Sequence, residues 1–315
     1  MAKRVRAAAE RETCGGDDMP WVGDTYFSAK LMARLARLIA IAAELEQQDE
    51  AFFDKMLSQL SDTLEKWLDK GAATPFIYDK SWGGLVSCGC KYDDCWGGCA
   101  PKCVNDVSQP ATCPALHDVG YNFGNGFYND HHFHYGYFIY SVAVLAKFRP
   151  EWEKTWRPQV LALIRDYANP SSQDMEFPIC RHKDWFMGFS WAGGIKFEPL
   201  GRNQESVSEA INSYYAIGVY GTVLANRGDE DSDVGMRLRQ LGRLLTAMEV
   251  HAGDTYWHVR PAGGIYTNYV HPTARGLAHW PLLGPCFDER QSLDLVRRVR
   301  PNGDGLSRFE VGNPF

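Results

Sequence analysis

The residues best suited to chemistry gather in one stretch, 121–140, with the sequence YNFGNGFYNDHHFHYGYFIY. It holds Asp130 and the histidines His131, His132 and His134 among several tyrosines and phenylalanines. Carboxylates and imidazoles are costly to bury, so they are of little use to a plain core. This composition suits a sugar, because rings stack on its C–H faces and the polar groups bond its hydroxyls. The same residues would also suit a metal ion.

A second candidate segment is 201–215, GRNQESVSEAINSYY. Glu205 and Glu209 lie four residues apart at the start of a predicted helix, so their carboxylates project from one face. The plain explanation is that acidic residues favour the first turn of a helix. The polar residues around them, including Asn203, and the nearby Tyr215 favour a helix start that lines a cavity.

Between these two segments lies 177–192, FPICRHKDWFMGFSWA, which has no clean amphipathic period. It contains Asp184 with Trp185 and Trp191. Tryptophans in loops beside charged groups are natural platforms for sugar rings, although either ring could equally fill space in the core. Both interpretations stay open at this point.

The elements that would position these residues are helices. Successive helices read as pairs separated by Gly-, Pro- and aromatic-rich loops, and repeated helical hairpins can close into a ring with a site at its mouth. Strand signals are short, at 84–87 and 264–268. The chain is therefore predicted to be all-α. Apolar residues recur at helical spacing over residues 25–47, 50–69, 134–148, 151–168, 204–226 and 231–250.

Composition excludes several classes of function. A formal net charge of −6 over 315 residues argues against a nucleic-acid partner, which usually meets a basic face. No apolar run approaches the roughly 20 residues of a membrane-spanning helix. Residues 1–23 lack the apolar core of a signal peptide, so we expect no signal peptide in this sequence and no membrane partner.

Six of the nine cysteines fall between residues 88 and 113, in a Gly- and Asp-rich insertion. One interpretation is a small zinc knuckle. The other is a loop held by disulfides, which would imply an oxidising compartment; we favour it because the spacings do not repeat as CxxC pairs. The isolated Cys14, Cys180 and Cys286 are expected to be ordinary thiols.

The motifs NGFYNDHHFHYGYF, HKDWFMGFSWAGG and GRNQESVSEAINSYY together resemble glycoside hydrolase family 81, the endo-β-1,3-glucanases. The segments DTYFSAKLMARLARLIAIA and FIYDKSWGGLVS resemble the same catalytic region, so the likeness runs from about residue 21 to about 267. The resemblance implies an (α/α)6 barrel. It also implies inverting hydrolysis of internal bonds in laminarin-like or callose-like glucan, without a metal or other cofactor.

Residue by residue, the resemblance makes Asp130 the general acid and Glu205 the general base, with His134 and Glu209 as further active-site residues. An inverting pair stands roughly 6.5–9.5 Å apart, across the sugar. Asp130 and Glu205, on different hairpins, could straddle a cleft in this way, whereas two acids on one helical face are less suited to it. The residues expected to bind glucan are His132, Asp184, Trp185, Trp191, Asn203 and Tyr215.

The resemblance also sets expectations for domains. Residues 21–267 would be the catalytic domain, with the Cys-rich insertion at 88–113. Residues 1–20 and the divergent segment 268–315 would be disordered, and the barrel would be incomplete. The family's amino-terminal β-sandwich domain has no counterpart here, and Phe189 stands where the family usually has histidine. The protein would be an extracellular or cell-wall monomer.

Two alternatives remain. A catalytically impaired relative would keep the groove and bind glucan without cleaving it. A metal enzyme would use His131, His132 and His134 with Asp130, although on a helix positions 131 and 134 share a face and 132 points away.

Overall fold

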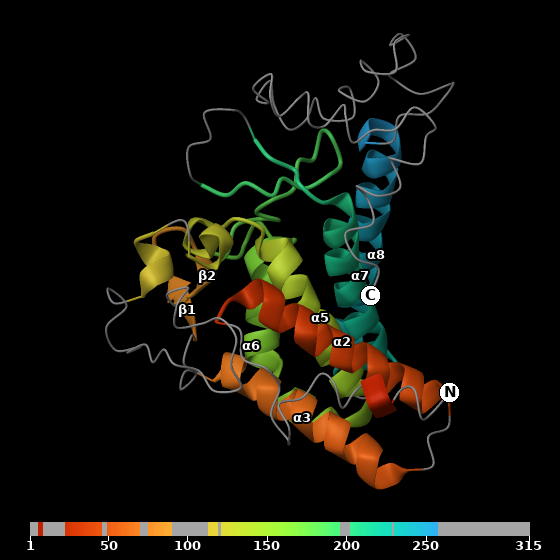
Figure 1. Cartoon of the computed structure of the whole chain (residues 1–315). Helices are drawn as coiled ribbons and strands as arrows, with labels where there is room; N and C mark the ends of the chain where they lie inside the picture. Colours follow the sequence, from red (N-terminus) through yellow and green to blue (C-terminus); the bar gives the residue numbers. More distant parts are fainter. Residues whose placement is uncertain are drawn as a thin grey trace, which may run out of the picture.

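The computed structural model describes residues 6–8, 23–45, 49–69, 75–89, 113–118, 121–195, 202–228 and 230–257. This part of the chain is dominated by helices, with one small β-hairpin (Figure 1). The main elements are α2 (Thr25–Glu44), α3 (Glu50–Leu68), β1 (Phe76–Asp79), β2 (Gly84–Ser87), η2 (Pro114–Leu116), η3 (Tyr121–Phe127), α5 (His131–Phe148), α6 (Pro150–Ala168), α7 (Val207–Ala225), α8 (Ser232–Ala252) and η4 (Gly253–Trp257).

Within the described residues, the helices form three hairpins, α2/α3, α5/α6 and α7/α8 (Figure 1). Helix α5 packs against both α2 and α7, so these three helices form a row in the middle of the described structure. Nearly every residue of α5 is buried, which accords with a helix that is apolar all round. The predicted pairing of helices is confirmed. Closure of the hairpins into a complete ring stays a prediction.

Helices α2, α3 and α7 begin at side chains that accept hydrogen bonds from the first turn. Asp24 accepts from the backbone N–H of Phe27 at 2.6 Å and caps α2, and Asp49 caps α3 in the same way. Ser206 caps α7 by accepting from the N–H of Glu209 at 3.3 Å. The starts of α2 and α3 agree with the predicted helices, which begin at residues 25 and 50.

Two helix starts differ from prediction. Helix α5 begins at His131 rather than at 134, and α7 begins at Val207 rather than at 204. Just before each start stands a residue in the left-handed backbone region, Asp130 with φ 56° and Glu205 with φ 66°. Such a conformation cannot continue a right-handed helix, so it places the boundary.

Glycines permit two close helix contacts. A Cβ on Gly136 of α5 would lie 2.5 Å from the Cα of Ser213 on α7. A Cβ on Gly242 of α8 would lie 2.3 Å from the backbone nitrogen of Gly218 on α7. Real Cβ contacts are never this short, so the backbones of α5, α7 and α8 approach each other only because these side chains are absent.

The β-hairpin pairs β1 with β2 in antiparallel register, Phe76 opposite Ser87 and Asp79 opposite Gly84. The predicted strand at 84–87 is confirmed. Its partner β1 was not predicted, because four residues are too few to show a period. The other predicted strand, 264–268, lies outside the described residues.

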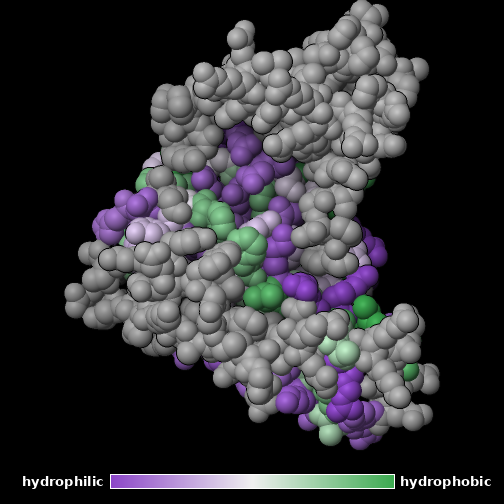
Figure 2. Space-filling model, in the orientation of Figure 1, coloured by the Kyte–Doolittle hydropathy of each residue, from purple (hydrophilic) through white to green (hydrophobic). Residues whose placement is uncertain are grey.

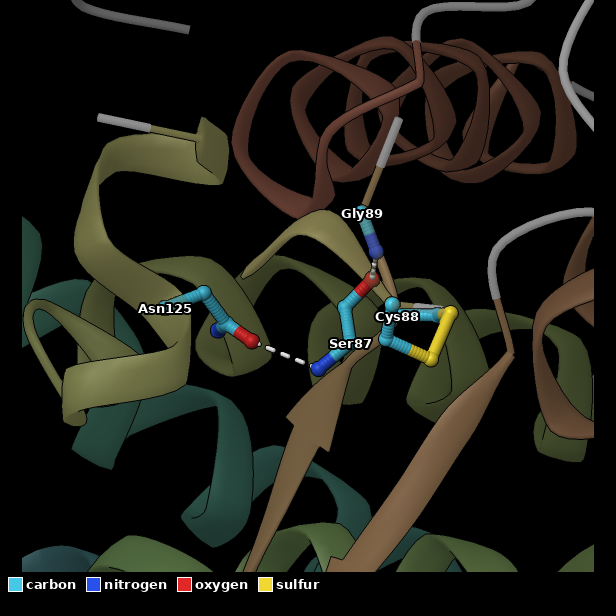
Figure 3. Close-up of a disulfide and its surroundings, with 5 residues drawn as sticks. Ser87, Cys88, Gly89 and Asn125 are labelled. Carbon is cyan, nitrogen blue, oxygen red and sulfur yellow. Dashed lines mark hydrogen bonds between the residues drawn. A yellow bond between two sulfur atoms is a disulfide. The ribbon is translucent and has the colours of Figure 1, made fainter. Parts of the chain in front are cut away.

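A disulfide joins Cys88, at the end of β2, to Cys113, just before η2 (Figure 3). The backbone of Cys88 also pairs with η2, because its carbonyl accepts from the N–H of Ala115 at 3.1 Å. The N–H of Ser87 donates to Asn125 in η3 at 2.6 Å. The two ends of the Cys-rich insertion are therefore held together and against η3. For this pair of cysteines the disulfide interpretation is correct and the zinc interpretation is not.

The remaining cysteine predictions are mostly untested. Cys180 is buried with a free thiol, as expected of an ordinary cysteine. The cysteines between positions 89 and 112, together with Cys14 and Cys286, lie outside the described residues. So do 268–315 and most of 1–20; Arg6 is described, and its guanidinium donates to Asp49 at 2.8 Å.

Within the described ranges, none of the helices is both long and apolar enough to cross a membrane. On the face shown in Figure 2, hydrophilic and hydrophobic residues are interspersed on the described surface.

Candidate active site

The starts of α5 and α7 carry the two principal candidates. Asp130 directly precedes α5 and is partly buried, and Glu205 precedes the cap of α7 and is exposed. Helices α5 and α7 pack against each other. A left-handed backbone at non-glycine residues is uncommon, and such strain gathers at functional sites. Both acids are therefore held in backbone positions that the surrounding structure imposes.

Helix α2 adds a phenol and an ammonium group beside Glu209. Tyr26 donates its hydroxyl proton to Glu209 Oε1 at 2.8 Å, and Lys30 Nζ donates to the same hydroxyl at 2.9 Å. Tyr137 of α5 donates to Glu209 Oε1 at 2.7 Å, and Lys30 Nζ lies 3.6 Å from that oxygen. The nearly buried carboxylate of Glu209 is therefore held by two phenols and faces a cation.

The negative charges of all three carboxylates affect the pKa of the Tyr26 hydroxyl. Burial raises the pKa of Tyr26 above its usual range, and the nearby negative charges of Glu209, Glu205 and Asp130 raise it further. The phenol therefore stays protonated and acts as a donor. Asp130 and Glu205 thus lie close enough to one hydroxyl on α2 for their charges to act on it.

Sequence reasoning did not single out Tyr26, Lys30 or Tyr137. A usable signal was present, because Tyr26 and Lys30 stand four residues apart in the DTYFSAK segment and so share one face of α2. Their contact with Glu209 spans more than 170 residues of sequence, and no local pattern reports such a contact.

His134 is a buried residue that helps to hold this cluster in place. It is almost fully buried, and its Nδ1 lies 2.6 Å from the hydroxyl of Thr25. The backbone N–H and hydroxyl of Thr25 both donate to Asn122 Oδ1, at 2.9 and 3.0 Å. Burial lowers the pKa of His134 well below its usual range, so the ring is neutral. His134 therefore ties the start of α2, which carries Tyr26, to α5.

His131 and His132 contact other parts of the structure. His131 Nδ1 lies 2.6 Å from Asp166 Oδ2, and its Nε2 lies 2.8 Å from the carbonyl oxygen of Asn125. His132 is fully buried, and its ring centroid lies 4.5 Å from that of His182. His132 therefore belongs to the core and not to a surface that a glucan could reach.

The three histidines of the HHFH run thus meet three different surroundings, and this divergence disfavours the metal-enzyme hypothesis. Across the described residues, no group of three or more histidine, cysteine or acidic side chains could hold a metal ion. Because successive helical positions point about 100° apart, adjacent histidines in a helix cannot all face one ion.

The loop at 182–191 is braced by Asp184. One of its oxygens accepts from the N–H groups of Phe186 and Met187, and the other accepts from the indole N–H of Trp191 at 3.1 Å. Both oxygens are thus used within the loop, and Asp184 orients Trp191. Trp185 is 54% exposed and is open to a ligand.

Phe189 is buried beneath this loop. Its ring centroid lies 4.7 Å from that of Trp191, edge to face, and it packs on Ala252. The departure from the family's histidine therefore puts an apolar residue into the core under Trp191, where it does not meet substrate directly.

The last two predicted residues flank the acids of α7. The Asn203 amide donates to Glu205 Oε2 at 3.3 Å. Tyr215 is 55% exposed and borders a cavity of about 70 Å³ next to Glu209. The cavity is lined by Arg37, Phe133, Gly136, Tyr137, Tyr140, Glu209, Asn212, Ser213 and Tyr215.

Comparison with known families is decisive at this point. The model of the glycosyl hydrolase family 81 C-terminal domain matches residues 2–275. The chain belongs to glycosyl hydrolase family 81. This membership agrees with the order of the motifs that carry Asp130, the 182–191 loop and Glu205.

Family 81 relatives share the name glucan endo-1,3-β-D-glucosidase. The chain is 35% identical over 245 residues to the Glycine max enzyme, covering 77% of this chain and 31% of that protein. It is 30% identical over 276 residues to the Thermobifida fusca enzyme, covering 85% and 31% respectively. The chain therefore spans about a third of the length of these relatives.

A solved family 81 structure has a similar fold. It is an alanine variant of a glycoside hydrolase from Clostridium thermocellum, with a TM-score of 0.58 and 29% sequence identity. The match covers 81% of this chain and 30% of the solved chain. The hairpins described above are thus arranged as in a family 81 catalytic region.

Proposed function

We propose that this chain hydrolyses internal β-1,3 bonds of glucan, with Asp130 as general acid and Glu205 as general base. The supporting observation is that the loops carrying Asp130 and Glu205 precede the packed helices α5 and α7 and are linked by backbone hydrogen bonds through Ala192. Paired carboxyl groups of this kind are what glycoside hydrolysis requires. The names of the family 81 relatives supply the substrate class.

In the proposed reaction, protonated Asp130 gives its proton to the glycosidic oxygen as the C1–O bond breaks. Glu205 takes a proton from a water molecule whose oxygen attacks C1 from the opposite face, so the anomeric configuration inverts. Asp130 ends as a carboxylate and Glu205 ends protonated, and exchange with solvent restores both. The exposure of Glu205 suits a residue that must meet water.

Glu209 has a different proposed role. Its Oε1 accepts from Tyr26 and Tyr137 and lies near Lys30, so the carboxylate is held in place. Hydrogen bonds to a charged acceptor are strong and directional. We assign Glu209 to holding the sugar and shaping the local field rather than to activating water.

Glucan contacts are assigned to aromatic rings of the 182–191 loop and of α7. Trp185 and Tyr215 would stack on sugar faces, and Trp191, oriented by Asp184, would form a wall of the groove. Asn203 would bond a sugar hydroxyl beside Glu205. His134 would not bind glucan; through Thr25 it would hold the start of α2, which carries Tyr26, against α5.

The Cys88–Cys113 disulfide supports an extracellular or cell-wall location for the proposed enzyme. Disulfides persist in oxidising compartments and are rare where thiols are kept reduced. We also propose that the protein is a monomer.

The test is reducing-sugar release from laminarin by the whole chain. Asp130→Asn and Glu205→Gln should each abolish release while leaving helical circular dichroism and laminarin binding intact. Glu151→Gln, at an exposed carboxylate on α6, is the matched control and should release product normally. Near-normal turnover by Glu205→Gln would show that the base is another residue.

A second assay examines the stereochemistry. Azide added to Glu205→Ala would replace the attacking water, so inversion predicts an α-glycosyl azide as the product. A β-configured azide adduct would instead indicate retention.

A glucan-binding relative without hydrolysis is the second candidate. The observation that favours it is Phe189, an apolar residue buried against Trp191 where the family usually has histidine. Laminarin binding by the unmodified chain with no product after prolonged incubation would favour this candidate.

A further inference from the structure

Residues 190–195 lie between the two proposed catalytic loops. The carbonyl oxygen of Ala192 accepts from the backbone N–H of Asp130 at 2.9 Å, and the N–H of Ala192 donates to the carbonyl oxygen of Asn203 at 2.8 Å. The amide of Asn203 in turn donates to Glu205 Oε2 at 3.3 Å. A single residue, Ala192, therefore links the acid loop to the base loop.

The backbone of segment 190–195 packs directly against the loop that precedes Asp130. The N–H of Gly194 donates to Asn129 Oδ1 at 2.8 Å. The N–H of Ile195 donates to the carbonyl oxygen of Phe127 at 2.9 Å. A Cβ on Gly194 would stand 1.9 Å from that same carbonyl oxygen. The two backbones are thus in direct contact, and a shift of the 190–195 segment must shift the residues that precede Asp130.

The other end of the segment is anchored on α8. Ser190 forms an antiparallel bridge with Lys183, and its hydroxyl donates to Glu249 Oε1. Lys183 Nζ lies 3.0 Å from the same carboxylate oxygen and donates to the carbonyl of Gly188 at 2.7 Å. The Tyr214 hydroxyl, on α7, lies 2.8 Å from the Ser190 hydroxyl.

The ion pair at this anchor is completely buried, since neither the Lys183 nor the Glu249 side chain is exposed. Burial lowers the pKa of Lys183 and raises that of Glu249, and each group's charge opposes the shift of the other. A buried ion pair adds little net stability compared with apolar residues of similar size. What it does supply is directional bonding, here to the backbone at Gly188 and the hydroxyl of Ser190.

We propose that Lys183 and Glu249 are positioning residues, which hold segment 190–195 and thereby set the placement of Asp130 relative to Glu205. The inference rests on the proposed function, because it assigns these residues to the same acid–base pair. Neither residue contacts substrate. Both act through Ser190 and Ala192.

The test is the double variant Lys183→Met/Glu249→Leu, which removes both charges at once and so leaves no unpaired buried ion. We expect it to fold with unchanged helical circular dichroism and to keep its KM for laminarin within about twofold. We expect kcat to fall roughly 10- to 100-fold, because a displacement of about 1 Å can cost this much.

Glu153→Gln is the matched control. Glu153 is an equally buried carboxylate, and it accepts from Arg157, Arg227 and Tyr220 where α6 meets α7. This variant should lower stability and leave kcat unchanged. If the double variant kept wild-type kcat, or if Glu153→Gln lost as much kcat, the positioning role would be refuted.

A second readout distinguishes positioning of the acid from general damage. A nitrophenyl glycoside of a laminarin oligosaccharide needs little protonation of its leaving group, so misplacement of Asp130 should slow it much less than laminarin. Equal losses on both substrates would overturn the proposal.

Hydrogen exchange separates this inference from the proposed function. The amide of Asp130, bonded to Ala192, should exchange faster in the double variant than in wild type or Glu153→Gln. If the unmodified chain failed to cleave laminarin, the proposed function would fail, and this exchange measurement would still decide whether the ion pair anchors the segment. Unchanged exchange at Asp130 would refute the anchor.

Discussion

Removing the Cys88–Cys113 disulfide should cost a calculable amount of stability. The two residues are 25 positions apart, so the bond closes a loop of about that length in the unfolded chain. The change to make is the double variant Cys88→Ala/Cys113→Ala, which removes the cross-link without leaving a reactive thiol. Both cysteines are fully buried, so alanine introduces no polar group into the core.

The expected magnitude follows from the loop length. The chain-entropy relation for a loop of about 25 residues gives a loss of about 3.5 kcal/mol in the free energy of unfolding at 25 °C. For a domain of this size, 1 kcal/mol shifts Tm by roughly 2–4 °C. The double variant should therefore melt roughly 7–14 °C lower than the unmodified chain.

The assay is urea unfolding followed by far-ultraviolet circular dichroism, with thermal melting as a second measurement. Cys180→Ala is the matched control, because it deletes a buried sulfur that forms no cross-link. It should lose only the packing of one sulfur atom. If the double variant were within about 1 kcal/mol of this control, the disulfide would not constrain the unfolded chain as argued.

Three further predictions concern the helix contact, the phenol and acid stability. Gly136→Ala should lower the free energy of unfolding by about 1–3 kcal/mol in urea titrations, because its Cβ would overlap Ser213. Tyr26→Phe should lower kcat on laminarin roughly 10- to 100-fold, because it removes a hydrogen bond to the Glu209 carboxylate worth about 1.5–3 kcal/mol. In the folded chain, hydrogen bonds from Arg165 lower the pKa of Asp174 from 3.8 to about 2. The unfolded chain therefore binds this proton more readily, and the stabilisation, present above about pH 4, is lost as pH falls towards 2. Asp174→Asn should remove that part of the acid dependence of the urea midpoint.

Each of these predictions has a control. Gly218→Ala places a Cβ no closer than 3.7 Å to any neighbouring atom, so it should not destabilise the chain, and equal losses at both glycines would contradict the packing argument. Tyr78→Phe removes a hydroxyl that donates to the carbonyl of Glu176 on the surface and should leave kcat unchanged. An unaltered acid profile in Asp174→Asn would show that Arg165 does not set it.

Much of the helical organisation was predictable from sequence, because each helix depends on neighbours within a few residues. Apolar spacing located α2, α3 and α6 to within a few residues, and their starts are marked by local residues, the caps Asp24 and Asp49 and the first-turn Pro150. The starts of α5 and α7 were missed by three residues. Their boundaries are fixed by the left-handed backbones at Asp130 and Glu205, which contacts from other elements maintain.

Some features of the candidate site were also predictable from sequence, and others were not. Residue types and the family motifs brought out Asp130, Glu205 and Glu209, because both can be read from short stretches of sequence. The sequence could not show that His132 would be wholly buried, or that Tyr26 would donate to Glu209. Side-chain partners more than a hundred residues apart depend on how the helices pack.

The amino-acid sequence by itself therefore determined paired helices and the family, and it supplied the acids that we propose for the reaction. Only the tertiary structure decided how those acids are held, with the Tyr26 phenol from α2 bonded to Glu209 and a backbone link through Ala192 between the loops of Asp130 and Glu205. The physical reason is the distance along the sequence over which each kind of interaction acts. Helix formation and capping act over a few residues, whereas the separation of two carboxylates depends on burial and hydrogen bonding among segments that meet only after folding.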